Sequence, residues 1–330
     1  MDNIFGSPYP SCMAQPDPDL QPLLVIVGPT ASGKTRLAVE TAEALSGEIV
    51  SADAFAVYRK MDIGTDKPDP ETRSRVRHHV IDVAEPDERF SAGDFVAAAT
   101  AAIEEIRSRG AVPIISGGTH FYVRALLLGL FPSPPHDPEL RASLEAEWDD
   151  DPAAVFTALE SVDPVTSKKI GPRDRQRILR SLEVYKLTGT PISEHWERDR
   201  QSPRFRPMMA APQQSREDLY ARIEVRVDNM FSFGLEEEVR RILASGVPRD
   251  AHALKAIGYR QVVAMFDGEH DRITAIEHTK RATRQFAKRQ LTWLRSLREG
   301  TLHWVAGTEQ GGAEAVISRW TQHVREGWAP

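Results

Sequence analysis

The stretch Leu23-Leu-Val-Ile-Val-Gly28-Pro-Thr-Ala-Ser-Gly-Lys-Thr35 decides the fold of this chain. A short run of apolar residues such as 23–27 is typical of a strand buried on both faces of a parallel sheet. The next residues match the pattern G-x-x-x-x-G-K-[S/T], and a helical pattern continues from Thr35 to about residue 45. A strand, a glycine-rich loop and a helix in this order predict a phosphate-binding P-loop.

Each part of this loop has a role in holding phosphate. Glycines let backbone N–H groups point into one concavity, and the helix N-terminus adds its dipole. Lys34 is expected to reach the phosphates and Thr35 to be a ligand of Mg²⁺. The predicted phosphate site is Gly28, Pro29, Thr30, Ala31, Ser32, Gly33, Lys34 and Thr35. The motif indicates a phosphorylated ligand but does not specify ATP.

Further strands are expected at residues 48–52, 80–83 and 112–116, with a helix over 97–109. This alternation predicts an α/β fold with a parallel sheet flanked by helices, whose sites lie at the carboxyl ends of the strands. Asp53 and Thr119 follow two of these strands. Asp53 could bind Mg²⁺, accept a proton from a nucleophile or simply cap its turn. The Gly117-Gly118-Thr119 segment could bring a hydroxyl to the same cleft or be a plain turn.

The chain changes character after residue 131. Prolines cluster between residues 132 and 138, the stretch to 200 is helical in pattern, and the proline-containing segment 201–215 reads as a return linker. We expect a catalytic core at 21–131 and 201–300 with an all-helical insertion at 132–200. Residues 1–20 are expected to be disordered, and 301–330 to form a C-terminal tail.

Composition narrows the function classes. A single cysteine excludes a disulfide framework and a cysteine-based zinc site, and indicates a reducing cytoplasm. No apolar run is long enough for a membrane span. The net charge of −6 gives no global signal for nucleic acid, so any basic surface must be local.

Two basic segments stand out against this acidic background. Residues 173–180 carry four arginines, and residues 280–298 carry seven Lys/Arg and no acid. On a helix all of these seven but Arg289 fall within an arc of about 100°. The pattern predicts an outward basic stripe. The stripe is either a solvated charged face or a surface that binds the phosphodiester backbone of a nucleic acid. The absence of acids favours the nucleic-acid-binding surface.

These motifs together resemble the tRNA dimethylallyltransferases, over nearly the whole of residues 23–298. The resemblance rests on the P-loop and on Ser51-Ala-Asp53, Met61-Asp-Ile-Gly-Thr65, Ser91-Ala-Gly-Asp-Phe95, Gly117-Gly-Thr119, Asp174-Arg-Gln-Arg-Ile-Leu-Arg180, Arg222-Ile-Glu-Val-Arg226, Ala256-Ile-Gly-Tyr-Arg260 and Thr283-Arg-Gln-Phe-Ala-Lys-Arg-Gln-Leu-Thr-Trp293. It implies transfer of the dimethylallyl group of dimethylallyl diphosphate to N6 of adenosine 37, in tRNAs that read codons beginning with U. It also implies that the target base flips out of its stack. The single cysteine indicates a cytoplasmic protein, and a monomer is the default expectation.

The resemblance also implies roles for residues. Asp53 would be the general base, Thr119 a second catalytic group, and Arg222 would bind the diphosphate together with the P-loop and Mg²⁺. The implied contacts to the tRNA anticodon stem-loop are Asp53, Ala54, Phe55, Ala56, Thr119, Arg141, Gln176, Arg177, Ile178, Leu179, Arg180, Lys255, Gly258, Tyr259, Arg260, Lys288, Arg289, Gln290, Thr292, Trp293 and Arg295.

Some positions depart from the family pattern. Ala54 and Ala56 stand where the family usually has Ser and Gln, so details of base recognition are in doubt. His120 replaces the glycine that usually follows Gly-Gly-Thr. Two other enzymes share the P-loop: a nucleotide kinase, which would not need the basic segments, and an adenylate isopentenyltransferase, which would not need the helical insertion.

Overall fold

The computed structural model describes residues 20–130, 134, 137–198, 203–297 and 300–326. The chain divides into two compact units: one comprises Gln15–Leu127 with Arg204–Pro330, and the other contains Leu128–Pro203. The predicted disordered segment 1–20 lies, apart from Leu20, outside the described residues. No helix among the described residues is long and apolar enough to cross a membrane.

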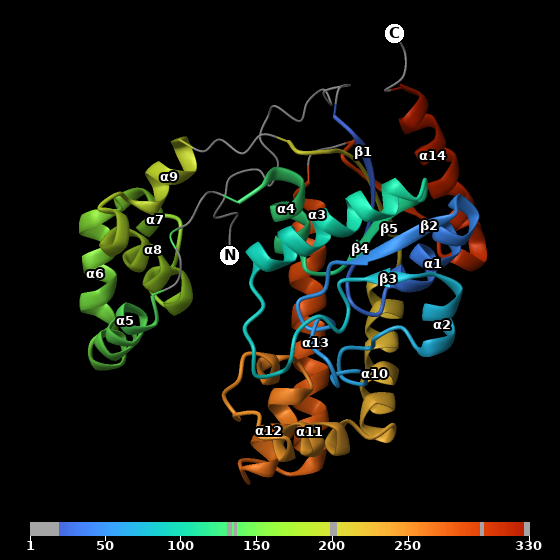
Figure 1. Cartoon of the computed structure of the whole chain (residues 1–330). Coiled ribbons are helices and arrows are strands. Elements are labelled where there is room, and N and C mark those ends of the chain that lie inside the picture. The colour runs from blue at the N-terminus through green and yellow to red at the C-terminus, as the bar shows by residue number, and fades with distance from the viewer. Residues whose placement is uncertain (1–19, 131–133, 135–136, 199–202, 298–299, 327–330) are drawn as a thin grey trace. The chain divides into compact units, whose positions relative to one another are not determined.

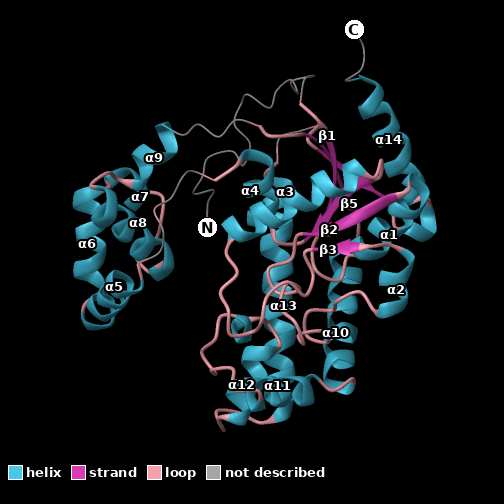
Figure 2. Cartoon of the chain, viewed as in Figure 1, coloured by secondary structure: helices cyan, strands magenta, loops and turns pink. Residues whose placement is uncertain are grey.

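The larger unit is built on a six-stranded sheet with the strand order β3-β2-β4-β1-β5-β6 (Figures 1 and 2). Every neighbouring pair of strands is parallel. The strands are β1 (Pro22–Val27), β2 (Gly47–Ser51), β3 (His78–His79), β4 (Val112–Gly117), β5 (Arg206–Pro212) and β6 (Leu302–Val305). The predicted α/β class is confirmed.

Helices cover both faces of this sheet. Leu24 and Ile26 of β1 join one buried cluster with α1 (Lys34–Leu45) and α14 (Gly312–Glu326). Alternation along the strand turns Leu23 and Val25 to the opposite face. There α3 (Ala92–Ser108) packs against β2 and β4. A Ser91–Asp94 capping box starts α3 several residues before the predicted position.

A group of helices extends beyond the carboxyl edge of the sheet (Figure 1). The long helices α10 (Arg216–Ser232) and α13 (Arg272–Arg295) pack on each other, and α11 (Leu235–Ala244) and α12 (Tyr259–Phe266) follow α10. Residues 219–245 do not form one continuous helix, because Gly234, with a φ of 99°, separates α10 from α11. The short helices α2 (Pro70–Arg75) and α4 (His120–Leu128) complete the unit.

Three sequence predictions for this unit are wrong. The strand expected at 80–83 does not form, because Val80 and Asp82 have positive φ angles of 60° and 57°; the pairing residues are His78 and His79. The expected linker 201–215 contains β5, which lies between β1 and β6. Its apolar centre, Met208–Ala211, is buried, and its prolines lie near the two ends.

The expected tail at 301–330 belongs to the core. Strand β6 pairs with β5, and α14 packs on α1, with Val316 and Trp320 buried in the cluster beneath the sheet. Trp304 remains exposed and the strand is only four residues long, so its sequence pattern carries little signal.

The smaller unit is helical throughout its described part. It contains α5 (Pro138–Asp150), α6 (Pro152–Val162), α7 (Pro164–Ser167), α8 (Arg175–Thr188) and α9 (Ile192–Arg198). The first three of these each begin with an Asp N-cap followed by Pro, an arrangement that favours helix initiation. Residues from α5, α6 and α8 form their own apolar core.

Candidate phosphate and acceptor site

The P-loop lies between the carboxyl end of β1 and the start of α1. Gly33 is the N-cap of α1 with a φ of 84°, and Ala31 has a φ of 63°. These left-handed conformations turn successive backbone amides toward one side of the loop. Lys34 is the first residue of the helix. Burial, followed by the charge of Arg226, lowers the pKa of Lys34 to about 8, while Asp53 and Asp66 act in the opposite direction.

Two glutamines fix this loop from distant parts of the sequence. The Gln290 side chain on α13 accepts a hydrogen bond from the Thr30 N–H (2.8 Å) and donates one to the Gly118 carbonyl (2.8 Å). Gln214, just beyond β5, donates to the Ser32 carbonyl (2.8 Å). The P-loop is therefore tied both to the loop after β4 and to the end of β5.

Asp53 and Thr119 come together at the carboxyl ends of β2 and β4. One carboxylate oxygen of Asp53, Oδ1, accepts hydrogen bonds from the Phe55 and Ala56 N–H groups (2.9 and 3.1 Å). Among the described residues no donor is assigned to its other oxygen, Oδ2. Thr119 Oγ1 accepts from the Ala54 N–H (3.0 Å), so its own hydroxyl proton remains free to donate. Asp53 thus caps its turn and still presents an oxygen that can take a proton.

The strand ends approach this closely because Gly117 has no side chain. A Cβ on Gly117 would lie 2.1 Å from the Ala52 carbonyl oxygen, and a Cβ on Gly118 would lie 2.4 Å from Gln290 Nε2. The paired glycines are therefore required by packing and are more than a flexible turn.

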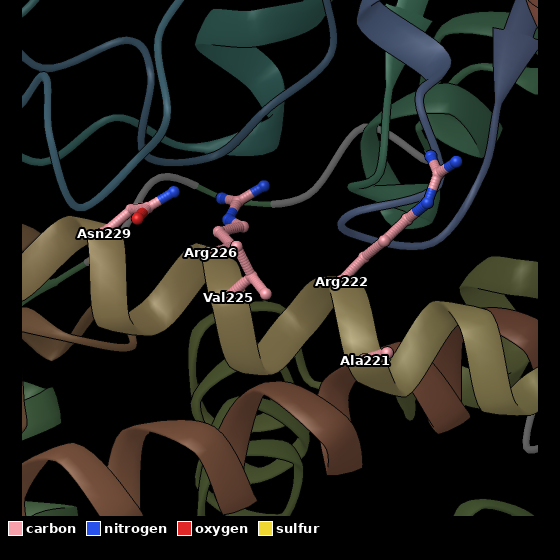
Figure 3. Close-up of a pocket in the computed structure, with 5 residues that line it drawn as sticks. All are labelled: Ala221, Arg222, Val225, Arg226 and Asn229. Carbon is pink, nitrogen blue, oxygen red and sulfur yellow. The ribbon is translucent and has the colours of Figure 1, made fainter.

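Helix α10 supplies two arginines on one face. Figure 3 shows Arg222 and Arg226, one turn apart, pointing to the same side of the helix, with Ala221, Val225 and Asn229 lining the same pocket. The Arg222 guanidinium lies 3.7 Å from the position that a Cβ on Gly33 would take. Arg222 therefore lies beside the P-loop. The sequence reasoning did not select Arg226, although the spacing of one helical turn was a signal for it.

His120, a departure from the family pattern, is buried at the start of α4. Its ring stacks on Trp293 of α13 with a centroid distance of 4.1 Å and an interplanar angle of 17°. Burial, followed by the neighbouring charge of Lys34, lowers the pKa of His120 to about 3. The imidazole is therefore neutral near pH 7, and Trp293 is held in place by it.

Several residues expected to contact RNA have buried side chains. Ile178 and Leu179 are fully buried in the core of the smaller unit, Tyr259 is fully buried in the larger unit, and Gln290 is committed to the P-loop. Gly258, also buried, has a φ of 97° and caps α12. For these residues the structure supports a positioning role, because their side chains do not reach the surface.

The remaining expected RNA contacts divide into three groups. Arg141 and Arg180 pair with the buried carboxylate of Glu183 in the smaller unit. Ala54, Phe55 and Ala56 form the turn after Asp53, where Phe55 stacks on His252. The exposed members are Gln176, Arg177, Lys255, Arg260, Lys288, Arg289, Thr292 and Arg295.

The basic stripe on α13 is only partly outward, which corrects the sequence prediction. Lys280 contacts Asp228 (2.9 Å) and Glu224 (3.5 Å) of α10, and Arg284 also pairs with Glu224. The acids absent from residues 280–298 are therefore supplied mainly by α10, and Glu277 of α13 itself lies 3.6 Å from Lys280. Arg281, Lys288 and Arg295, spaced seven residues apart, remain exposed.

Thr35, the expected Mg²⁺ ligand, is exposed in the first turn of α1. The described residues contain no group of three or more His, Cys, Asp or Glu side chains suited to hold a metal ion. A Mg²⁺ ion commonly binds through one or two protein oxygens together with substrate phosphates. The Thr35 hydroxyl, exposed directly after the phosphate loop, fits that type of site.

The fold and the site define a P-loop α/β protein in which a carboxylate and a hydroxyl accompany the phosphate loop. The chain belongs to the IPP transferase family, whose sequence profile matches residues 56–297. It is 47% identical to tRNA dimethylallyltransferase 1 of Trichlorobacter lovleyi over 87% of this chain and 94% of that protein.

Solved structures agree with this assignment. A tRNA isopentenylpyrophosphate transferase from Bacillus halodurans, 35% identical, matches with a TM-score of 0.67 over 93% of this chain and 98% of its own. A eukaryotic dimethylallyltransferase described as acting on tRNA, 26% identical, matches with a TM-score of 0.77 over 91% of this chain and 77% of its own.

Proposed function

We propose that this chain transfers the dimethylallyl group of dimethylallyl diphosphate to N6 of adenosine 37, in the anticodon stem-loop of tRNAs that read codons beginning with U. We further propose that it works in the cytoplasm as a monomer. The observation that carries the proposal is the position of Asp53 and Thr119, which the Ala54 N–H links at the sheet edge that also carries the phosphate loop. Family membership supports the same activity.

The donor's diphosphate is held by the P-loop amides, Lys34 and Arg222. Positive charge fixed in advance around the leaving group stabilises the negative charge that grows on it during transfer. Mg²⁺, when bound through Thr35 and the phosphates, supplies further charge neutralisation. The hydrogen bonds from the loop to Gln290 and Gln214 keep the loop backbone oriented, so that it need not reorganise during the reaction.

The acceptor is a weak nucleophile, because the lone pair of an adenine amine is delocalised into the ring. The new bond joins N6 to the first carbon of the dimethylallyl group, and the bond from this carbon to the diphosphate oxygen breaks. Asp53 Oδ2 takes the proton that N6 loses, since Oδ1 is occupied by two backbone N–H groups. The free Thr119 hydroxyl proton can be donated to the departing diphosphate or to the entering nucleotide.

RNA binding is assigned to exposed basic residues of each unit. In the larger unit these are Lys255, Arg260, Arg281, Lys288 and Arg295, and in the smaller unit Arg177. Local positive charge on an acidic protein is sufficient to hold a phosphodiester backbone. The partly exposed Trp293 ring, stacked on the buried neutral His120, adds an aromatic group near the P-loop.

Release of diphosphate from the donor tests the proposal. We expect release with Mg²⁺ and an anticodon stem-loop carrying A36-A37-A38, and little release with AMP or without acceptor. Release with AMP but not with the stem-loop would identify an adenylate isopentenyltransferase. Phosphorylation of a nucleotide by ATP, with no turnover of the prenyl donor, would identify a kinase.

A further inference from the structure

An acidic residue pairs with one of the two arginines that face the donor site. Arg226 Nη1 of α10 lies 2.8 Å from Asp66 Oδ2, and the side chains are 21% and 61% exposed, respectively. Asp66 follows the Met61–Thr65 segment. The proposed chemistry assigns no role to this pair.

Arg226 lies close enough to the phosphate loop for its charge to act on Lys34. It lies one turn after Arg222 and points to the same side of α10 (Figure 3). Arg226 lowers the pKa of Lys34, which burial already lowers, whereas Asp66 raises it. Lys34, Arg222 and Arg226 therefore form a cationic group in which Asp66 cancels part of the charge.

The loop that carries Asp66 is held firmly. The Glu238 carboxylate of α11 accepts hydrogen bonds from the N–H groups of Asp62, Ile63 and Gly64. The Tyr259 hydroxyl donates to the same carboxylate, and its ring packs so closely that a Cβ on Gly64 would lie 2.3 Å from it. This explains why Tyr259 is buried in the unit instead of reaching RNA.

The backbone at Asp66 also fixes the direction of its side chain. Asp66 has a φ of 55°, a left-handed conformation that few residues other than Gly, Asn and Asp adopt readily. Its N–H bonds to the Ile63 carbonyl at 3.2 Å. The carboxylate is therefore presented to Arg226 by a rigid turn, while its exposure to water keeps the ion pair weak.

A diphosphate carries several negative charges and is a stronger partner for Arg226 than one exposed carboxylate. We propose that Asp66 is a built-in counter-ion, which holds Arg226 while the donor site is empty and yields it to the donor's diphosphate. Asp66 is then a positioning residue that weakens the binding of the donor and of product diphosphate alike. This inference rests on the proposed function, because it takes a diphosphate as the ligand of the P-loop.

The proposal predicts tighter binding when the Asp66 charge is removed. Asp66→Asn keeps the shape and the tolerance for a left-handed backbone. From the usual strength of exposed ion pairs, we expect inorganic diphosphate to bind about two- to fivefold more tightly. The KM for dimethylallyl diphosphate should fall by a similar factor, and kcat should fall if release of diphosphate limits turnover.

Calorimetric titration of the full chain with inorganic diphosphate and Mg²⁺ tests this without RNA. The matched control is Asp267→Asn, which removes an acid from another exposed Arg–Asp pair, Arg249–Asp267, also at 2.8 Å; it should leave the affinity unchanged. In an Arg226→Ala background, Asp66→Asn should lose its effect, as a double-mutant cycle requires for a direct pair.

Three results would overturn the inference. Unchanged affinity in Asp66→Asn would show that Asp66 does not compete for Arg226. Weaker binding with a higher Mg²⁺ requirement would make Asp66 a metal ligand. Equal tightening with Arg226 present or absent would make its effect nonspecific. If the unsubstituted chain binds no diphosphate, the proposed function itself fails, so the two failures are distinguishable.

Discussion

The Gln290 side-chain oxygen accepts a hydrogen bond from the backbone N–H of Thr30 at 2.8 Å, although the two residues lie 260 positions apart. The same amide donates to the Gly118 carbonyl, so one buried side chain joins the P-loop to the loop that carries Thr119. The orientation of the phosphate loop therefore depends on α13, which is far from it in the sequence.

Gln290→Leu should destabilise the protein and weaken diphosphate binding. The substitution leaves the Thr30 N–H and the Gly118 carbonyl buried without partners, which costs about 2–4 kcal/mol in total. Urea unfolding and diphosphate titration measure the two effects. Gln285→Leu is the control, because Gln285 lies exposed on the same helix. Equal effects of both substitutions would remove the special role of Gln290.

Asp53→Asn should lower kcat by about 10²–10⁴-fold, the usual contribution of a general base. The Asn oxygen can still cap the turn through the Phe55 and Ala56 N–H groups, so we expect RNA affinity and stability to change little. Single-turnover rates measure the loss of catalysis, and RNA titration measures any loss of binding. A loss of RNA binding as large as the loss of turnover would mean that Asp53 chiefly binds the substrate.

The pH dependence of kcat/KM for the donor should report the ionisation of the Lys34 side chain. Because its pKa in the free protein is lowered to about 8, Lys34 is charged below that pH and becomes neutral as the pH rises through it. We expect kcat/KM for the donor to fall above about pH 8, since this quantity reflects ionisations of the free enzyme. In Lys34→Arg, whose side chain does not titrate in this range, the inflection should vanish. An unchanged inflection in this variant would assign the titration to another group.

The exposed part of the α13 stripe should contribute to RNA affinity in proportion to its charge. Replacing Arg281, Lys288 and Arg295 with Ala should reduce the slope of log K against log salt by about 2 to 3. The control pair, Lys280→Gln with Arg284→Gln, should leave the slope nearly unchanged, because Glu224 and Asp228 already neutralise these residues. A similar slope for all variants would identify the stripe as a solvated face.

The sequence was most informative where local chemistry determines structure. The P-loop, the strands at 22–27 and 112–117 and the exposed basic residues follow from patterns within a few turns of chain. Strand β5 was missed because prolines near its ends resemble a linker, although burial of Met208–Ala211 determines the outcome. Strand β6 is short, and its place depends on pairing with β5, a contact that no local pattern encodes.

The contrast between local sequence patterns and contacts between distant segments applies to the site as well. Asp53, Thr119 and Arg222 follow from motifs, and the structure places them around the P-loop or at the sheet edge beside it. The roles of Gln214 and Gln290 depend on contacts between distant segments, and an amide side chain gives no signal of its partner. The stripe on α13 was overestimated because its neutralising acids lie on α10, a different part of the sequence.

The measurement that tests the central claim most directly is mass analysis of nucleosides from an anticodon stem-loop incubated with the chain, Mg²⁺ and dimethylallyl diphosphate. If the chain transfers the dimethylallyl group, one adenosine, at position 37, gains a single C5H8 unit on N6, and Asp53→Asn slows this gain by about 10²–10⁴-fold. An unmodified stem-loop, under conditions in which the chain binds both RNA and diphosphate, would contradict the account.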